Sequence, residues 1–136
     1  MKEILKKAEQ IAREAHKGQK RRDGKDYITH PEAVAKLVYG EELKIVAWLH
    51  DVIEDTNTTP EDLQKAGIPH HLIHSVQCLS RKKDENYCDF IIRCSKDKIA
   101  SLVKIADLKH NISDLQEGSM KDKYRLALHI LKEKWK

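Results

Sequence analysis

Four side chains that could act together chemically, His50, Asp51, Glu54 and Asp55, lie in the stretch 45–56, whose sequence is IVAWLHDVIEDT. At about 100° per residue of an α-helix, they fall inside an arc of roughly 140°, opposite an apolar face. Carboxylates and an imidazole that share a partly enclosed face need a partner, and a divalent metal ion is the natural one. The simpler alternative is an amphipathic helix with a solvated acidic face, which is the ordinary interpretation of an isolated His-Asp pair.

A second stretch, 102–115, repeats this arrangement. Asp107, His110, Asn111 and Asp114 are three and four residues apart, so they share one face of a helix. A single Asp on such a helix is usually solvated. Because Asp107 follows an apolar run, in the context Val-Lys-Ile-Ala-Asp, we expect it to be half-buried and therefore paired.

His30 precedes Pro31 at an expected helix start, where a lone His usually serves as a capping or surface residue. Combined with His50, Asp51 and Asp107, however, it completes a set of two imidazoles and two carboxylates. Such a mixed N/O set suits Mn²⁺ or Fe²⁺ better than structural Zn²⁺, which favours thiolates. Four protein ligands on an ion that accepts six would leave positions for water and substrate.

Glu54 and Asp55 are the candidate catalytic acids and bases. Glu54 lies one helical turn from both His50 and Asp51, and Asp55 lies one turn from Asp51. One of the two could orient or deprotonate water while the other assists the leaving oxygen, and the sequence leaves open which does which. Carboxylates at a helix C-terminus oppose the helix dipole by about 0.3–1 kcal/mol each, which favours a functional role.

The elements that must position these residues are all predicted to be helical. Hydrophobic periodicity and Gly, Pro and capping signals predict one all-α domain, residues 1–136, with seven to eight helices and no strand. The expected helices cover residues 2–17, 29–39, 42–55, 59–67, 69–79, 86–94, 97–115 and 119–136. Polar loops are expected at 18–29 and 80–85.

Composition excludes several classes of protein. No apolar run approaches the ~20 residues of a membrane span, and the N-terminus has no signal peptide pattern. Cys78, Cys88 and Cys94 lack disulfide or zinc spacing, so we expect a cytoplasmic protein. The net charge of +4 is mild and its bases are scattered, which argues against a nucleic-acid partner and fits a small anionic substrate. The sequence leaves the oligomeric state open.

Taken together, three stretches resemble a known family. Tyr-Ile-Thr-His-Pro at 27–31, Ala-Trp-Leu-His-Asp-Val-Ile-Glu-Asp-Thr at 47–56 and Val-Lys-Ile-Ala-Asp at 103–107, with Arg21, Arg22 and Asn111, occur in this order. The order His…His-Asp…Asp is similar to the signature of the HD superfamily of metal-dependent phosphohydrolases. Within it, the chain resembles the hydrolase half of RelA/SpoT-type alarmone enzymes, and more closely the small alarmone hydrolases.

The resemblance implies an HD fold, one bound Mn²⁺ (with Fe²⁺ or Co²⁺ as alternatives) and hydrolysis of the 3′-pyrophosphate of guanosine tetra- and pentaphosphate (ppGpp and pppGpp). By position, it implies that His30, His50, Asp51 and Asp107 bind the metal and that Glu54 and Asp55 handle water and protons. Substrate-binding roles are implied for Arg21, Arg22, Asn111 and Tyr124. With no synthetase domain after residue 136, we expect degradation only.

One departure from the family keeps alternatives open. RelA/SpoT-type members often carry Arg two residues after the Asn, where this chain has Ser113 followed by Asp114. The same site could therefore act on another nucleotide, such as the adenosine analogue or a phosphorylated dinucleotide cofactor. A nucleotide-sensing module without catalysis is a further alternative, against which the intact pair Glu54 and Asp55 argues.

Overall fold

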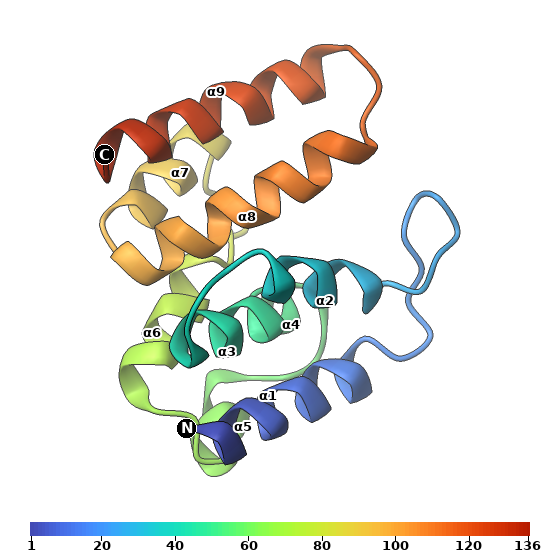
Figure 1. The fold of residues 1–136 in the computed structure, drawn as a ribbon, viewed down its shortest axis with the longest axis vertical. Coiled ribbons are helices and arrows are strands. Elements are labelled where there is room, and N and C mark those ends of the chain that lie inside the picture. The colour runs from blue at the N-terminus through green and yellow to red at the C-terminus, as the bar shows by residue number, and fades with distance from the viewer.

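The computed structural model describes residues 1–136 and is entirely helical, which confirms the predicted fold class (Figure 1). Only an isolated bridge between Lys20 and Asp26 has β geometry. The helices are α1 (Lys2–Ala15), α2 (Thr29–Lys36), α3 (Glu41–Leu49), α4 (Val52–Asp55), α5 (Pro60–Lys65), α6 (His70–Cys78), α7 (Tyr87–Ser95), α8 (Lys98–Asp114) and α9 (Ser119–Lys134). Helix α4 is a single turn that follows α3 after only two residues, and with these two counted as one element the helices number eight, within the predicted seven to eight.

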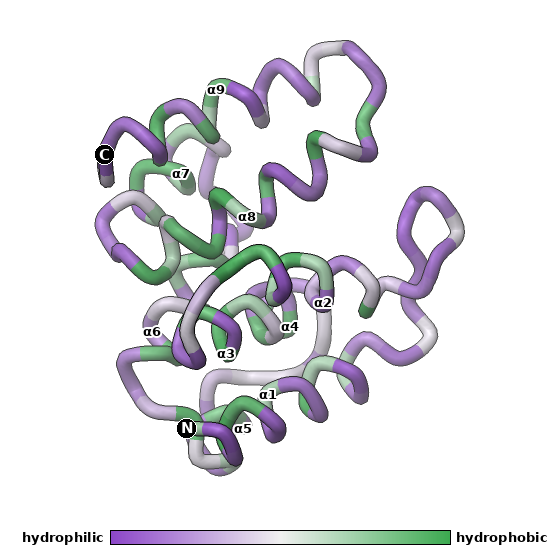
Figure 2. The backbone as a smooth tube through the Cα atoms, viewed as in Figure 1, coloured by the Kyte–Doolittle hydropathy of each residue, from purple (hydrophilic) through white to green (hydrophobic).

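Helix α3 lies at the centre of the molecule. It packs against α1, α2, α6 and α8, and its residues from Ile45 to Leu49 are all buried. The apolar run that marked this stretch in the sequence is therefore covered on every side, and the hydropathy colouring shows the same segment in green (Figure 2). The central position of α3 explains how its C-terminal end can meet residues from three other elements.

The predicted continuous helix over 42–55 is interrupted in the structure. Helix α3 ends at Leu49, His50 and Asp51 form a turn, and α4 begins at Val52. The His50 ring nitrogen Nδ1 lies 2.6 Å from the carbonyl oxygen of Ala47, whereas the backbone N–H of His50 reaches the same oxygen at 3.5 Å. The ring thus occupies an acceptor of the last turn of α3, and the helix breaks where the two site residues stand.

The segment between α1 and α2 is a loop, as predicted. It is pinned at its base by the bridge between Lys20 and Asp26, and it turns at Gly24, whose φ of 87° suits glycine. In Figure 1 this loop projects from the end of α1 beside the start of α2. Helix α2 ends at Lys36, three residues before the predicted Tyr39, because the chain tightens at Leu37 before Gly40 turns it towards α3.

Helices α7, α8 and α9 form the other half of the molecule (Figure 1). The side chains of Asn86 and Asp97 cap the N-termini of α7 and α8. The Trp135 indole donates a hydrogen bond to Ser101 Oγ at 2.8 Å, so the end of α9 is fixed against α8. No helix is both long enough and apolar enough to cross a bilayer.

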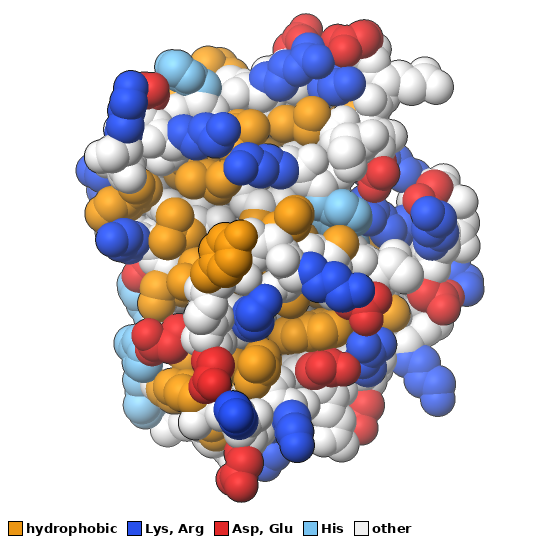
Figure 3. Space-filling model, viewed as in Figure 1, with side chains coloured by type: hydrophobic (Ala, Val, Ile, Leu, Met, Phe, Trp, Pro, Cys, Tyr) orange, Lys and Arg blue, Asp and Glu red, His pale blue; other side chains and the backbone are white.

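Acidic and basic side chains are interspersed over the face shown in Figure 3, without a continuous basic patch on that face. This distribution agrees with the mild net charge of +4. This face therefore offers no broad basic footprint of the kind that nucleic-acid binding uses.

Candidate metal centre

Three buried side chains from three helices converge beneath the loop between α1 and α2. His30 stands in the first turn of α2, His50 at the end of α3 and Asp107 in the middle of α8, and all three are at most 4% exposed. One ligand atom from each lies within 4.8 Å of the others. Residues 77 positions apart thus contribute to one cluster, with His30 Nε2 at 2.7 Å from Asp107 Oδ1.

Asp51 joins this cluster from the turn between α3 and α4. Its Oδ2 lies 3.0 Å from His50 Nε2 and 4.0 Å from His30 Nε2. The same oxygen accepts a hydrogen bond from the Tyr27 hydroxyl at 2.5 Å. The structure therefore brings together all four residues that the sequence singled out as metal ligands, and Tyr27 orients one of them.

The protonation of His50 can be inferred from its partners. Nδ1 faces the carbonyl oxygen of Ala47, an acceptor, so Nδ1 carries the hydrogen. In the neutral ring Nε2 is then an acceptor, and it is buried without a hydrogen-bond partner although carboxylate oxygens of Asp51 and Asp107 lie nearby. Such an arrangement, with one ring N–H on a backbone carbonyl and the other nitrogen free, is typical of a metal-binding imidazole.

The pKa values of the cluster indicate that it needs positive charge. Burial alone would lower the pKa of His50, but the carboxylates of Asp51 and Asp107 outweigh burial and raise that pKa well above its usual value. Burial would raise the pKa of Asp51, yet the adjacent His50 lowers it to about 2. A proton or a metal ion can supply the missing charge. The set of two imidazoles and two carboxylates fits a divalent first-row ion.

Lys104 is a charged neighbour of the cluster that we did not single out from the sequence as a functional residue. Its ammonium donates to Asp107 Oδ2 at 2.8 Å, while its other contact is the face of Phe90. Burial would lower the pKa of Lys104, but the charge of Asp107 raises it, so the side chain stays cationic. The sequence signal was its position three residues before Asp107, which places both on one side of α8.

The two candidate catalytic acids follow the cluster on α4. Glu54 Oε1 accepts a hydrogen bond from the backbone N–H of Arg81 at 2.5 Å, which ties it to the loop before α7. Burial and the nearby Asp51 raise the pKa of Asp55 to about 6, and burial also raises the pKa of Glu54. Asp55 can therefore exchange protons close to neutral pH, and the pKa of Glu54 is shifted in the same direction.

Arg21 and Asn111 lie next to the cluster, on the side of the loop. The Arg21 side chain is only 7% exposed, and its guanidinium is 3.0 Å from Asp114 Oδ2 and 3.3 Å from Asn111 Oδ1. Asn111 in turn donates to Asp107 Oδ1 at 3.1 Å. The expected substrate residue Arg21 is thus already engaged with the polar face of α8.

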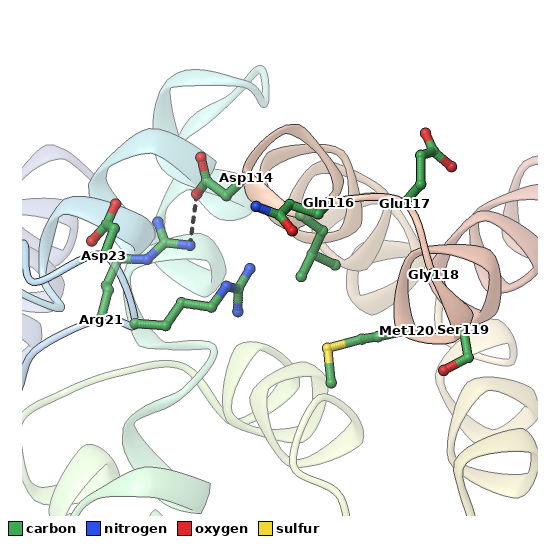
Figure 4. A pocket seen from close by; sticks show the side chains of 10 residues that line it. Arg21, Asp23, Asp114, Gln116, Glu117, Gly118, Ser119 and Met120 are labelled. Atoms are coloured by element: carbon green, nitrogen blue, oxygen red, sulfur yellow. Dashed lines mark ion pairs between the residues drawn. The ribbon is translucent and has the colours of Figure 1, made fainter.

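Arg22, the neighbour of Arg21, lines an open pocket of about 530 Å³ between the loop and the connection from α8 to α9. Figure 4 shows the ion pair of Arg21 and Asp114 at one side of this pocket and Ser119 and Met120 at the other. The lining is almost entirely polar or charged. Its size and polarity suit a small, highly charged ligand.

Tyr124, the fourth expected substrate residue, stands on α9 and is not part of this pocket. Its ring stacks on that of Tyr87 from α7, with centroids 6.0 Å apart. The structure therefore separates Tyr124 from Arg21 and Arg22, and its contacts are those of a residue that packs α9 on α7.

Comparisons with known proteins extend along nearly the whole chain. It is 34% identical over 95% of its length to a GTP pyrophosphokinase of Myxococcus xanthus. It is 38% identical over 85% of its length to a guanosine-3′,5′-bis(diphosphate) 3′-pyrophosphohydrolase of Haemophilus influenzae, and 39% identical over 89% to the bifunctional (p)ppGpp synthase/hydrolase SpoT of Escherichia coli K12. The chain spans about a fifth of the length of these curated relatives, 19% in each case.

A solved structure, described as a metazoan ortholog of SpoT that hydrolyses ppGpp, shares the fold. It superposes with a TM-score of 0.78 and 24% sequence identity, over 96% of this chain and 84% of that one. No family model matches the chain.

Proposed function

We propose that this chain, which is similar in sequence to RelA/SpoT-type hydrolases, is a metal-dependent hydrolase that removes the 3′-pyrophosphate from ppGpp and pppGpp. The products would be pyrophosphate and GDP or GTP. We propose Mn²⁺ as the metal, with Fe²⁺ or Co²⁺ as alternatives that the same ligands accept.

The observation that carries this proposal is the convergence of His30, His50, Asp51 and Asp107 around a buried, unpartnered ring nitrogen of His50. We assign the four as the metal ligands. When bound, a divalent ion would neutralise phosphate charge and favour the ionisation of water near neutral pH. Tyr27, through Asp51, and Lys104, through Asp107, would hold the two carboxylates in place.

The two acids on α4 are assigned the proton transfers. Water adds to the phosphorus atom attached to the ribose 3′ oxygen, the bond from that phosphorus to the 3′ oxygen breaks, and the 3′ oxygen takes up a proton as the water loses one. Glu54 and Asp55 stand one turn beyond the ligands and have raised pKa values. A group with a pKa near the working pH transfers protons most effectively, at about 10²–10⁴-fold in rate.

The open pocket is assigned to the anionic substrate. Arg22 lines it without an ion pair, so its guanidinium is available to grip phosphate or stack on a base. Arg21 and Asn111 would form the wall between pocket and ligands. Tyr124 remains a proposed substrate residue only for a nucleotide that extends beyond the pocket to the stack of Tyr124 on Tyr87.

The test is a panel of nucleotides incubated with the protein and Mn²⁺, with release of pyrophosphate measured against release of orthophosphate. We expect pyrophosphate from ppGpp and no turnover after EDTA. Cleavage of the adenosine analogue alone would retain the chemistry and overturn the guanine assignment, and Ser113 would be the first position to examine. Binding of ppGpp without release of pyrophosphate in Mn²⁺, Fe²⁺ or Co²⁺ would favour the sensing module instead.

A further inference from the structure

His110 connects the buried arginine of the loop to a proposed metal ligand. Its Nδ1 lies 2.7 Å from Nδ1 of His30 and 3.3 Å from the guanidinium of Arg21. The His30 and His110 rings are stacked, with centroids 4.9 Å apart and an angle of 24° between planes. Nothing in the proposed reaction requires His110, yet it contacts two of the residues that the reaction uses.

The direction of these hydrogen bonds follows from Arg21. A guanidinium only donates, so Nδ1 of His110 must accept. His30 Nδ1 faces the same acceptor and must therefore carry its hydrogen, which leaves Nε2 of His30 as the nitrogen with a free electron pair. That nitrogen points at Asp107 Oδ1, 2.7 Å away, and towards Asp51. Two acceptors at this distance need a cation between or beside them.

The same arginine also reaches the other buried ligand. Arg21 donates to Asn111 Oδ1 at 3.3 Å, and Asn111 Nδ2 donates to Asp107 Oδ1 at 3.1 Å. Asp114 holds the guanidinium in this position from the end of α8. Arg21 is thus connected to His30 through His110 and to Asp107 through Asn111. Both arginines line the pocket, but Arg22 has no such connection to a proposed ligand.

We propose that His110 is a positioning residue which, with Arg21, fixes His30 in the form that carries hydrogen on Nδ1 and so presents Nε2 to the metal. The two adjacent arginines then have separate tasks. Arg21 increases metal affinity through its contacts with His110 and Asn111, which hold the ligands His30 and Asp107, and Arg22 binds the substrate. This inference rests on the proposed metal site, but not on which nucleotide is cleaved.

The test is Mn²⁺ binding to the full chain after removal of metal, with free Mn²⁺ followed by electron paramagnetic resonance. His110→Leu removes the acceptor, and we expect the Kd for Mn²⁺ to rise about 10–100-fold, as for other outer partners of a ligating histidine. In His110→Asn, Oδ1 can occupy the place of Nδ1 and accept the same hydrogen bonds. This variant should restore the affinity to within about threefold of wild type.

The pair Arg21→Met and Arg22→Met supplies an independent comparison within one loop, and it decides the question if His110→Leu does not fold. We expect weaker Mn²⁺ binding only in Arg21→Met. Three results would overturn the inference. The first is unchanged Mn²⁺ affinity in His110→Leu, and the second is an equal loss of affinity in His110→Leu and His110→Asn. The third is equal Mn²⁺ affinity in the two arginine variants. A wild-type chain that binds no divalent metal would instead overturn the proposed function.

Discussion

The ligand cluster and the Arg22 pocket are neighbours, but they are built in different ways. The cluster takes its side chains from α2, α3 and α8, which pack on one another around buried residues of α3. The pocket is lined by the loop after α1 and by the connection between α8 and α9, where Gly118 lies. Helix packing fixes the first, whereas loop residues shape the second and can change at little cost to the core.

This difference bears on how far each function can be inferred. The proposed reaction depends on four ligands and two acids that lie in helices or in the turn between α3 and α4, so their chemistry can be inferred from the sequence motifs. The proposed substrate preference depends on exposed residues such as Arg22, and Ser113, which departs from the family pattern, precedes the pocket residue Asp114. Changes in the cluster should therefore abolish activity, and changes in the pocket should only shift it.

The largest effect is expected from Asp51→Ala, which removes one proposed ligand and the partner of Tyr27. We expect loss of bound metal and loss of turnover to the limit of detection, because the three remaining ligands, His30, His50 and Asp107, include only one carboxylate. Metal content by mass spectrometry and pyrophosphate release measure the two losses. Full metal content and activity in this variant would remove Asp51 from the site.

A smaller but specific effect is expected from Glu54→Gln. The amide keeps the shape of the side chain and can still accept from the backbone of Arg81, but it can no longer take up a proton. Metal content and nucleotide affinity should stay close to wild type while kcat falls by about 10²-fold or more. Asp55→Asn should act in the same way if Asp55 shares the proton transfer.

Equal kcat values in wild type and Glu54→Gln would show that Glu54 only anchors the loop before α7. The control is Glu61→Gln on α5, which removes a carboxylate that forms no ion pair. Its kinetic constants should match those of the wild type.

The sequence predicted the cluster better than the pocket, for a physical reason. Helical periodicity places residues three and four apart on one face, so Asp107 and Asn111 could be placed together from their spacing alone. Periodicity is silent on contacts between distant segments, so the link from Arg21 to His110 and the separation of Tyr124 from the pocket were not predicted. The break at His50 and Asp51 was missed because a side chain that bonds the preceding turn leaves no mark in a hydrophobic pattern.

Arg22→Ala tests the pocket directly. Because Arg22 lies in an exposed loop and lines the pocket without an ion pair, its loss should weaken substrate binding and leave the ligands intact. We expect KM to rise by about tenfold with kcat nearly unchanged, the pattern of a lost ground-state contact. An unchanged KM would show that Arg22 is a solvent-exposed residue that does not bind the substrate.

The smallest effect is expected at the far side of Glu54, where an ion pair holds the loop before α7. Arg93 binds Glu85 through two hydrogen bonds of 2.8 and 2.9 Å, and Arg81 in the same loop donates to Glu54. The bonds from Arg93 lower the pKa of Glu85 to about 2. A carboxyl group whose pKa is lower in the folded state stabilises that state when the pH is above its pKa in the unfolded state, about 4.3. This stabilisation is lost as the pH falls towards 2.

Glu85→Gln should therefore lower Tm slightly at pH 6, and the difference from wild type should shrink as the pH falls from about 5 towards 2, where the wild-type carboxyl also becomes protonated. Thermal unfolding at each pH by circular dichroism measures this difference. Metal affinity should be unchanged, because the ion pair contacts the loop before α7 and none of the proposed ligands. We expect a small decrease in kcat, because this loop also holds Glu54 in its orientation. A difference in Tm that stays constant over this range would show that the ion pair between Arg93 and Glu85 does not stabilise the folded state.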